Sequence, residues 1–226
     1  MKLYIKAVIF DLDGVITDTM PFHYHAWKSV LAQEQLKVKR IDVYKREGQR
    51  GVHSLISIFN DYGIVCSPPK AKRLLLQKEK IFKRIVKQKY ISGSRNFLKF
   101  LHSKKIPLAL VTGTAKHEVR RILPEKIIKY FTVIITGSDV YLGKPDPEPY
   151  QKALDLLKLN PAQAVVIENA PSGIKSAKAA GIKCLALTTS LPQHFLKEAD
   201  KVYHSFNTLR RQVQFINHSG AIGDQK

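Results

Sequence analysis

The chain has 226 residues, of which 44% are hydrophobic and 25% are charged, values that are ordinary for a folded globular protein. Its charge balance is unusual, because 38 Lys and Arg residues outnumber 18 Asp and Glu residues and leave a net charge of +20. Such an excess favours anionic partners, whether phosphate esters, nucleic acid or an acidic surface. The sequence contains no segment long and apolar enough to span a membrane, and its two distant cysteines, Cys66 and Cys184, do not form a disulfide framework. We therefore expect a cytoplasmic protein with no membrane partner.

The N-terminal segment Ala7–Phe10 is an apolar run that predicts a buried strand. The strand ends at Asp11, and Asp13 and Gly14 follow at once, so that two acids stand two residues apart just beyond it. Acids this close repel each other and require a cation such as Mg²⁺. Taken alone, the segment is also consistent with an acid-rich turn after an edge strand.

Helical periodicity dominates residues 19–88, where no convincing strand is present. Thr19 is expected to cap the first of these helices, with Pro21 in its first turn. From residue 89 onward strands and helices alternate, a pattern that predicts βαβ units and a doubly wound parallel sheet. We expect the tail from Gly220 to be frayed. The predicted strands cover residues 107–111, 133–136, 164–167 and 184–187, and the predicted helices cover residues 94–103, 116–130 with a break at Pro124, 147–157 and 172–180.

Polar side chains follow these strands, and the carboxyl ends of parallel strands meet at one edge of a sheet. Acids, hydroxyls, an amide and a lysine together suit phosphoryl transfer, with one carboxylate as nucleophile, another as acid and base, and cations that offset the phosphate charge. Taken singly, each residue has a structural explanation: the threonines could cap helices, the lysine could lie on the surface, and the Glu-Asn step could form a turn. Their order along the chain argues against these separate explanations. The set comprises Asp11, Asp13, Thr112, Thr114, Lys144, Glu168 and Asn169.

Four segments, residues 11–19, 111–114, 143–149 and 166–182, resemble the ordered motifs of the haloacid dehalogenase superfamily and, within it, of the β-phosphoglucomutase-like phosphatase branch. The resemblance covers nearly the whole chain. It implies an α/β fold in which a Rossmann-like, doubly wound parallel sheet forms the core and a small all-helical cap is inserted. The core would comprise residues 1–18 and 89–226 and the cap residues 19–88, in agreement with the helical periodicity of that segment.

The same resemblance implies a role for each motif residue. Asp11 would be the nucleophile that forms an aspartyl-phosphate. Asp13 would protonate the leaving group and then activate water. Thr112 would bind the phosphoryl oxygens and Lys144 would neutralise them. Apart from the resemblance, the backbone amides around Gly113 and Thr114 lie near the start of a predicted helix, a position that favours binding of an anion.

The resemblance also implies a Mg²⁺ site. The ion would be held by Asp11, the backbone carbonyl of Asp13 and Asn169, with Glu168 acting through a bridging water or just outside the ligands. The family often has an acid where this chain has Asn169. Because an amide oxygen brings no charge, we expect weaker metal binding and a larger part for Glu168.

Three residues of the expected cap are candidates for substrate binding: His23, Arg50 and Lys78. His23 and Trp27 are similar to a mutase pattern in which the histidine contacts the bound sugar phosphate, although Trp27 is explained more simply by packing. Arg50 lies in a Gly-rich loop, where its guanidinium suits phosphate or sugar oxygens. Lys78 falls where the family places a lysine over the phosphate, although many surface lysines surround it in the sequence.

These observations favour a Mg²⁺-dependent phosphatase that acts on small phosphorylated metabolites, with sugar phosphates first among them. A hexose phosphate mutase is the alternative, and it is weakened because no arginine falls where mutases hold a second phosphate. A basic protein that binds nucleic acid or an acidic partner on a retained fold is the third possibility, motivated only by the charge of +20. We expect a monomer that does not bind nucleic acid.

Overall fold

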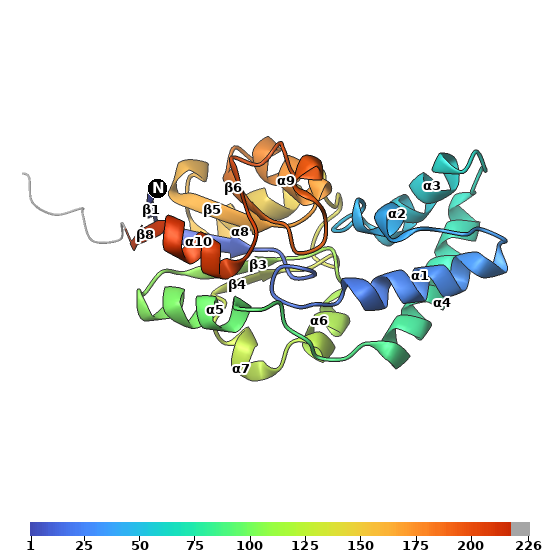
Figure 1. Cartoon of the computed structure of the whole chain (residues 1–226), viewed down its shortest axis with the longest axis horizontal. Helices are drawn as coiled ribbons and strands as arrows, with labels where there is room; N and C mark the ends of the chain where they lie inside the picture. The colour runs from blue at the N-terminus through green and yellow to red at the C-terminus, as the bar shows by residue number, and fades with distance from the viewer. Residues whose placement is uncertain (218–226) are drawn as a thin grey trace, which may run out of the picture.

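The computed structural model describes residues 1–217. Its centre is a six-stranded parallel sheet with the order β4-β3-β2-β5-β6-β7 (Figure 1). The strand order reverses beside β2, and ligands of such sheets bind at this point, beyond the carboxyl ends of the strands. The predicted parallel α/β fold is confirmed. The strands are β2 (Ala7–Phe10), β3 (Leu108–Val111), β4 (Val133–Ile135), β5 (Ala164–Glu168), β6 (Lys183–Leu187) and β7 (Lys201–Tyr203).

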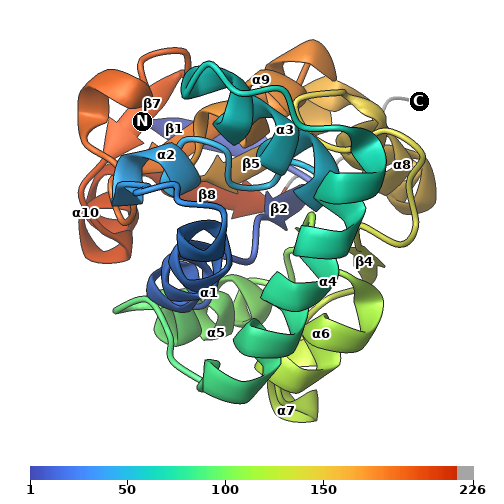
Figure 2. The ribbon, with the colours of Figure 1, turned by 90° about the vertical axis from the view of Figure 1, so that its right-hand side faces the viewer.

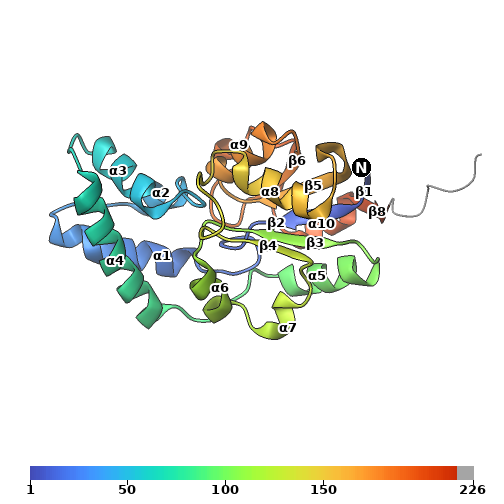
Figure 3. The same ribbon diagram turned by 180° about the vertical axis from the view of Figure 1, so that it is seen from behind.

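Every residue of β2, β3 and β5 is buried, because helices cover both faces of the sheet (Figure 3). On one face, α5 and α10 contribute Phe97 and Phe206 to a cluster that contains Phe10 of β2. On the other face, Tyr150 of α8 and Ile174 of α9 pack with the opposite side of the sheet. The helices of this part are α5 (Ser94–Ser103), α6 (Lys116–Ile122), α7 (Glu125–Ile128), α8 (Glu148–Leu157), α9 (Pro171–Ala179) and α10 (Phe206–Gln212), with short 3-10 helices η1 (Pro161–Gln163) and η2 (Gln193–Phe195).

Four helices form a separate lobe beyond the carboxyl ends of the strands (Figure 1). Figure 2, viewed from the side of this lobe, shows its helices in front of the sheet. The lobe has an apolar cluster of its own, to which Trp27, Leu31, Phe59 and Leu74 belong. As the periodicity predicted, the described residues 20–85 contain no strand. The helices are α1 (Met20–Gln33), α2 (Arg40–Tyr44), α3 (Gly51–Asp61) and α4 (Pro68–Ile85).

The sequence patterns did not predict β7, α10 or two strands at the ends of the described chain. These two strands, β1 (Lys2–Ile5) and β8 (Gln214–Asn217), pair in parallel as a second, two-stranded sheet. Their buried Leu3 and Phe215 join the same cluster as Phe10. The predicted fraying from Gly220 lies outside the described residues. Within residues 1–217, no helix combines the length and the apolar character needed to cross a membrane.

Candidate active site

Three neighbouring strands bring predicted site residues to one edge of the sheet. Asp11 and Asp13 follow β2, Thr112 follows β3, and β5 ends with Glu168, after which comes Asn169. These strands are adjacent and parallel, so their carboxyl ends lie together. All five residues are buried.

Lys144 reaches the same edge from the loop between β4 and α8. Its Nζ lies 2.6 Å from Oδ1 of Asp11 and 2.7 Å from Oε1 of Glu168, and it donates to the carbonyl of Val111 at 3.1 Å. Burial alone would lower the pKa of Lys144, but the charges of Asp11 and Glu168 hold this pKa above its ordinary value. Lys144 is therefore a fixed cation beside Asp11, able to offset the charge of a bound anion.

Glu168 uses both of its carboxylate oxygens for contacts within the protein. Besides Lys144, its Oε1 accepts a hydrogen bond from the hydroxyl of Tyr150 at 2.8 Å. Its Oε2 accepts from the backbone amides of Asn169 and Ala170 at 2.9 and 3.3 Å. Glu168 thus orients Lys144 and the turn after β5, and its role at a metal stays a prediction.

Asp13 is surrounded by hydrogen-bond donors. Its Oδ1 accepts from the hydroxyl of Thr19 and lies 3.4 Å from Nε2 of His23, and its Oδ2 accepts from the hydroxyls of Thr114 at 2.7 Å and Thr112 at 3.5 Å. Burial would raise the pKa of Asp13, but His23 and the hydroxyls of Thr19 and Thr114 hold this pKa well below its ordinary value. Thr19 occupies the predicted cap position of α1, yet its side chain binds Asp13 instead of capping the helix. Asp13 is therefore held as a carboxylate.

His23 connects Asp13 to the helical lobe. Lys78 of α4 is buried and places its Nζ 2.9 Å from Nδ1 of His23. Because an ammonium group can only donate, Nδ1 is the acceptor, and the proton of the neutral ring is on Nε2, the nitrogen near Asp13. Burial and the charge of Lys78 lower the pKa of His23 and favour this neutral form. The structure therefore brings two of the three predicted cap residues next to the acids.

Arg50, the third predicted cap residue, has no hydrogen bond or ion pair with Asp11 or Asp13 in the described part of the chain. It is exposed and is the N-cap residue of α3. Its guanidinium donates to the backbone carbonyl of Tyr141, in the loop that precedes Lys144. Arg50 therefore joins the lobe to the sheet at the edge of the site.

Glu47, in the segment between α2 and α3, was not among the predicted site residues. Its side chain is buried, and its Oε2 accepts a hydrogen bond from Nδ2 of Asn169 at 3.1 Å. The backbone next to it is docked on the sheet edge, since a Cβ added to Gly113 would lie 2.7 Å from the carbonyl oxygen of Gly48. Ser172 also donates to the carbonyl of Glu47. The lobe thus brings a further acid into the site.

Three buried oxygens at this edge have no hydrogen-bond partner among residues 1–217: Oδ2 of Asp11, Oδ1 of Asn169 and Oε1 of Glu47. Carboxylate and amide oxygens are the ligands that Mg²⁺ prefers, and buried unpaired oxygens are costly. Burial raises the pKa of Asp11 to about 8, against the lowering effect of Lys144, and burial with the neighbouring acids raises the pKa of Glu47 well above its usual range. A bound cation would relieve this crowding of acids.

A set of oxygen ligands for a metal ion at this edge has to include the side-chain amide oxygen of Asn169. In the described part of the chain, no three His, Cys, Asp or Glu side chains form a metal cluster by themselves. Two carboxylates together with an amide oxygen and a backbone carbonyl nevertheless match the oxygen-rich, partly hydrated coordination of Mg²⁺. The residues present therefore fit this ion.

A cavity of about 280 Å³ lies between the lobe and the sheet edge. Asp11, Asp13 and the loop of residues 112–114 line it from the sheet, and Trp27 and Lys78 line it from the lobe. A molecule that enters the cavity therefore meets both acids and the cationic side chain of the lobe.

Residues 8–187 match the family model described as haloacid dehalogenase-like hydrolase. The chain belongs to this family. This match confirms the resemblance drawn from the four sequence motifs. It also confirms the predicted enzyme class, a hydrolase, and agrees with the α/β fold described above.

Named members of the family that are similar to this chain include a phosphatase and mutases. The chain is 35% identical to the phosphorylated carbohydrates phosphatase of Thermotoga maritima, over 79% of this chain and 83% of that protein. It is 30% identical to the β-phosphoglucomutase of Bacillus subtilis, over 83% of this chain and 85% of that protein. The crystal structure of β-phosphoglucomutase from Clostridium difficile matches with a TM-score of 0.77 and 25% identity, over 92% of this chain and 96% of that chain.

Proposed function

We propose that this enzyme is a Mg²⁺-dependent phosphatase that hydrolyses phosphate monoesters of small carbohydrates through an aspartyl-phosphate at Asp11. The observation that carries the proposal is the buried contact of 2.6 Å between Asp11 and Lys144, beside the cavity. Similarity to a phosphorylated carbohydrates phosphatase supports the substrate class. We also propose that residues 1–18 and 89–226 act as the core and residues 19–88 as the cap. The two cysteines are free and buried, which supports a cytoplasmic location.

The first half-reaction transfers the phosphoryl group to the protein. The hydroxyl of Thr112 and the backbone amides of residues 112–114 hold the phosphoryl oxygens, and Lys144 offsets the charge of these oxygens. An oxygen of Asp11 attacks phosphorus, and its new bond forms as the bond between phosphorus and the leaving oxygen breaks. The negative charge of the bound phosphoryl group raises the pKa of Asp13, so that Asp13 takes up a proton when the substrate binds. It gives this proton to the leaving oxygen, and the carbohydrate leaves as a neutral alcohol.

The second half-reaction releases inorganic phosphate. Asp13, now a carboxylate, takes a proton from water while the water oxygen attacks phosphorus. The bond between phosphorus and Asp11 breaks, and Asp11 returns to its initial state. The hydrogen bonds from Thr19 and Thr114, together with His23, stabilise the carboxylate form of Asp13 that this step needs.

Mg²⁺, when bound, neutralises the charge that gathers between Asp11 and the phosphoryl group. Asp11, the backbone carbonyl of Asp13 and Asn169 would hold the ion. The unpaired Oε1 of Glu47 makes this residue a further candidate ligand. Because Glu47 brings the negative charge that the amide of Asn169 lacks, it offsets the weaker metal binding expected from Asn169 alone.

Release of inorganic phosphate from a panel of sugar phosphates, measured with Mg²⁺ and with a chelator, tests the proposal. We expect hydrolysis of several sugar phosphates with Mg²⁺ and none with the chelator. The Asp11→Asn variant should be inactive on the whole panel, whereas Asp155→Asn, at an exposed position of α8, is a matched control that keeps its activity. No phosphate release by the unmodified enzyme from any substrate would overturn the proposal.

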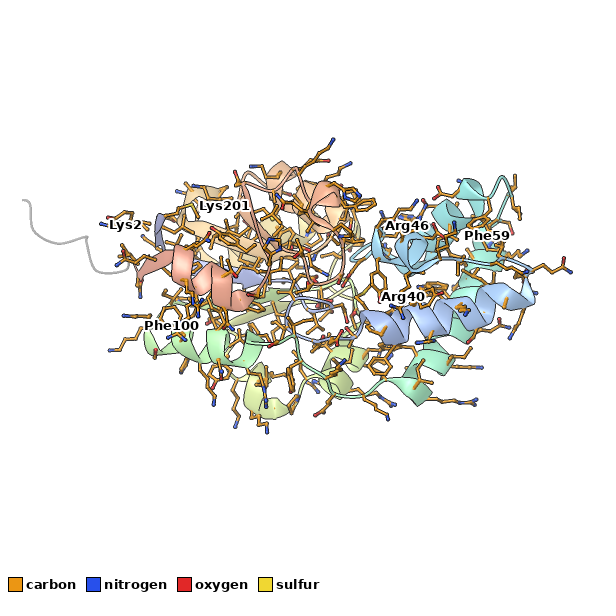
Figure 4. The ribbon with its side chains drawn as sticks, viewed as in Figure 1. Lys2, Arg40, Arg46, Phe59, Phe100 and Lys201 are labelled. Atoms are coloured by element: carbon orange, nitrogen blue, oxygen red, sulfur yellow. The ribbon has the colours of Figure 1, made fainter. Side chains whose placement is uncertain are left out.

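A hexose phosphate mutase is the second candidate, supported by the similarity to the Bacillus subtilis enzyme and by the pair of His23 and Lys78. A mutase must bind a second phosphate, and two arginines of the described chain line the cavity. Both are engaged elsewhere. Arg46 lies in the lobe (Figure 4), where it forms an ion pair with Asp61, and Arg50 donates to a backbone carbonyl. We therefore favour hydrolysis. Incubation with β-glucose 1-phosphate and a bisphosphate primer separates the candidates, because a mutase yields glucose 6-phosphate and a phosphatase yields free phosphate.

A further inference from the structure

Glu118 is a buried carboxylate that the mechanism above does not use. It lies on α6, shortly after the loop of residues 112–114, and only 5% of it is exposed. It lines the same cavity as Asp11 and Asp13. Its Oε1 is buried and has no hydrogen-bond partner among residues 1–217. Because a buried carboxylate oxygen without a donor is costly, this oxygen is suited to accept a hydrogen bond from a molecule in the cavity.

Lys78 lines the cavity from α4, which lies beside α6 (Figure 2) and packs against it through Phe82 and Ile122. In the described chain no ion pair within 4.0 Å joins Lys78 to Glu118, and Nζ of Lys78 contacts His23 instead. Burial raises the pKa of Glu118 and the charge of Lys78 opposes this rise, whereas burial lowers the pKa of Lys78 and Glu118 opposes this fall. The cavity therefore presents an anion and a cation that influence each other without direct contact.

These two charges select the polarity of the leaving group. A leaving group with a second anionic centre would be attracted by Lys78 but repelled by Glu118. A leaving group with a charged amino group would be attracted by Glu118 but repelled by Lys78. A hydroxyl suits both, because it can donate to a carboxylate and accept from an ammonium group. Glu79 also lines the cavity and adds negative charge, whereas the two arginines that line it are engaged with Asp61 and with the backbone carbonyl of Tyr141.

We propose that Glu118 is a specificity residue that accepts a hydrogen bond from a hydroxyl of a neutral polyol leaving group, a sugar or an alditol, and disfavours leaving groups that carry a second phosphate or a carboxylate. The proposal rests on the phosphatase function proposed above and adds to it the class of leaving group. It predicts an enzyme that selects monophosphates over bisphosphates.

Steady-state kinetics of two variants test the proposal with glucose 6-phosphate, fructose 1,6-bisphosphate and p-nitrophenyl phosphate, whose aryl leaving group carries no further hydroxyl. Glu118→Leu removes both the acceptor and the charge, so kcat/KM for glucose 6-phosphate should fall about tenfold to a hundredfold relative to that for p-nitrophenyl phosphate. Glu118→Gln keeps an acceptor but loses the charge, so kcat/KM for fructose 1,6-bisphosphate should rise about tenfold relative to that for glucose 6-phosphate.

The matched control is Glu125→Gln, at an exposed position of α7, which should leave all three values of kcat/KM unchanged. Equal changes for all three substrates in the Glu118 variants would overturn the proposal, because a residue that only balances Lys78 does not distinguish leaving groups. The nearly isosteric glutamine variant decides the question even if the leucine variant does not fold. Failure of the unmodified enzyme to hydrolyse any of the substrates would instead overturn the phosphatase function itself.

Discussion

The side-chain amide of Asn169 donates a hydrogen bond to Oε2 of Glu47 at 3.1 Å, across 122 residues of sequence. The contact joins the end of β5 to the segment between α2 and α3, and each partner keeps one buried oxygen without a hydrogen bond. The lobe therefore completes the site with a charge as well as covering it. If Glu47 is a metal ligand as proposed, metal binding and the docking of the lobe are coupled, because both then depend on Glu47.

Replacement of Glu47 tests this coupling. Glu47→Gln keeps the shape of the side chain but removes its charge, so we expect the dissociation constant for Mg²⁺ to rise about tenfold to a hundredfold. Titration calorimetry with Mg²⁺ measures this value directly, without reference to turnover. Asn169→Asp in the Glu47→Gln background returns the charge to the site and should restore most of the affinity. An unchanged dissociation constant in Glu47→Gln would show that the carboxylate does not contribute to metal binding.

Thr19→Val removes one hydrogen bond from Asp13 while nearly preserving the volume of the side chain. Because this bond stabilises the carboxylate, its loss should raise the pKa of Asp13, and the acidic limb of the pH profile of kcat should move up by about one pH unit. The measurement is kcat across the acidic pH range. Thr132→Val, at an exposed position, is the control and should leave the profile in place. A profile of Thr19→Val that coincides with that of the unmodified enzyme would contradict the role of this hydroxyl.

Gly113→Ala tests the close contact between the sheet edge and the lobe. The added Cβ would lie 2.7 Å from the carbonyl oxygen of Gly48, so the segment that carries Glu47 must move. We expect kcat/KM to fall about tenfold or more, because a small displacement of site residues is costly, and the free energy of unfolding to fall by about 1–3 kcal/mol.

Gly63→Ala is the matched control for this variant. Gly63 has φ +71 and would place its Cβ in open space, with no heavy atom within 4 Å. The left-handed backbone should lower the free energy of unfolding by about 1–2 kcal/mol, while kcat/KM stays unchanged. If Gly113→Ala retained full kcat/KM, the contact between Gly48 and Gly113 would have no part in forming the site.

The stabilising effect of Mg²⁺ should depend on pH. In the metal-free protein the pKa of Asp11 is raised to about 8 and that of Glu47 is also raised, so the unfolded chain releases these protons at lower pH than the folded chain. The free energy of unfolding contributed by these groups is therefore present at acid pH and lost as pH rises from about 4 toward 8. Under the proposed metal site, Mg²⁺ should bind the ionised carboxylates and reverse this loss.

Thermal unfolding in Mg²⁺ and in chelator, at about pH 5 and about pH 8.5, measures this dependence. We expect a larger rise of Tm with Mg²⁺ at the higher pH. Potassium chloride at equal ionic strength is the control for charge screening. A rise of Tm that is equal at the two pH values would contradict the assignment of Asp11 and Glu47 to the metal site.

Local sequence patterns predicted the centre of the sheet. Segments such as Ala7–Phe10 are fully apolar because both faces of these strands are covered, and a polar residue marks the end of each. By contrast, β1 and β8 are short strands that pair with each other from opposite ends of the chain. Their pairing depends on the completed fold, so no local pattern reveals it.

Some residues of the candidate site could likewise be predicted from local sequence patterns, and others could not. Asp11 and Lys144 belong to motifs whose spacing is visible in the sequence. Glu47 lies in a run of charged residues that resembles a solvated loop, and its burial results from docking of the lobe on the sheet edge. The one local signal is its position before Gly48, in a loop whose glycine permits close approach to another backbone. Glu118 likewise resembles a surface residue in the sequence, yet it is buried in the completed fold.

The covalent intermediate at Asp11 is the central claim, and reductive trapping tests it most directly. An aspartyl-phosphate is reduced by borohydride to homoserine, whereas a free carboxylate is not, and mass spectrometry identifies the altered residue. With Mg²⁺ and a hydrolysed sugar phosphate present, we predict homoserine at position 11, and none in the Asp11→Asn variant or without substrate. Phosphate release that continues while residue 11 stays unmodified, or a modification found at another residue, would contradict the mechanism.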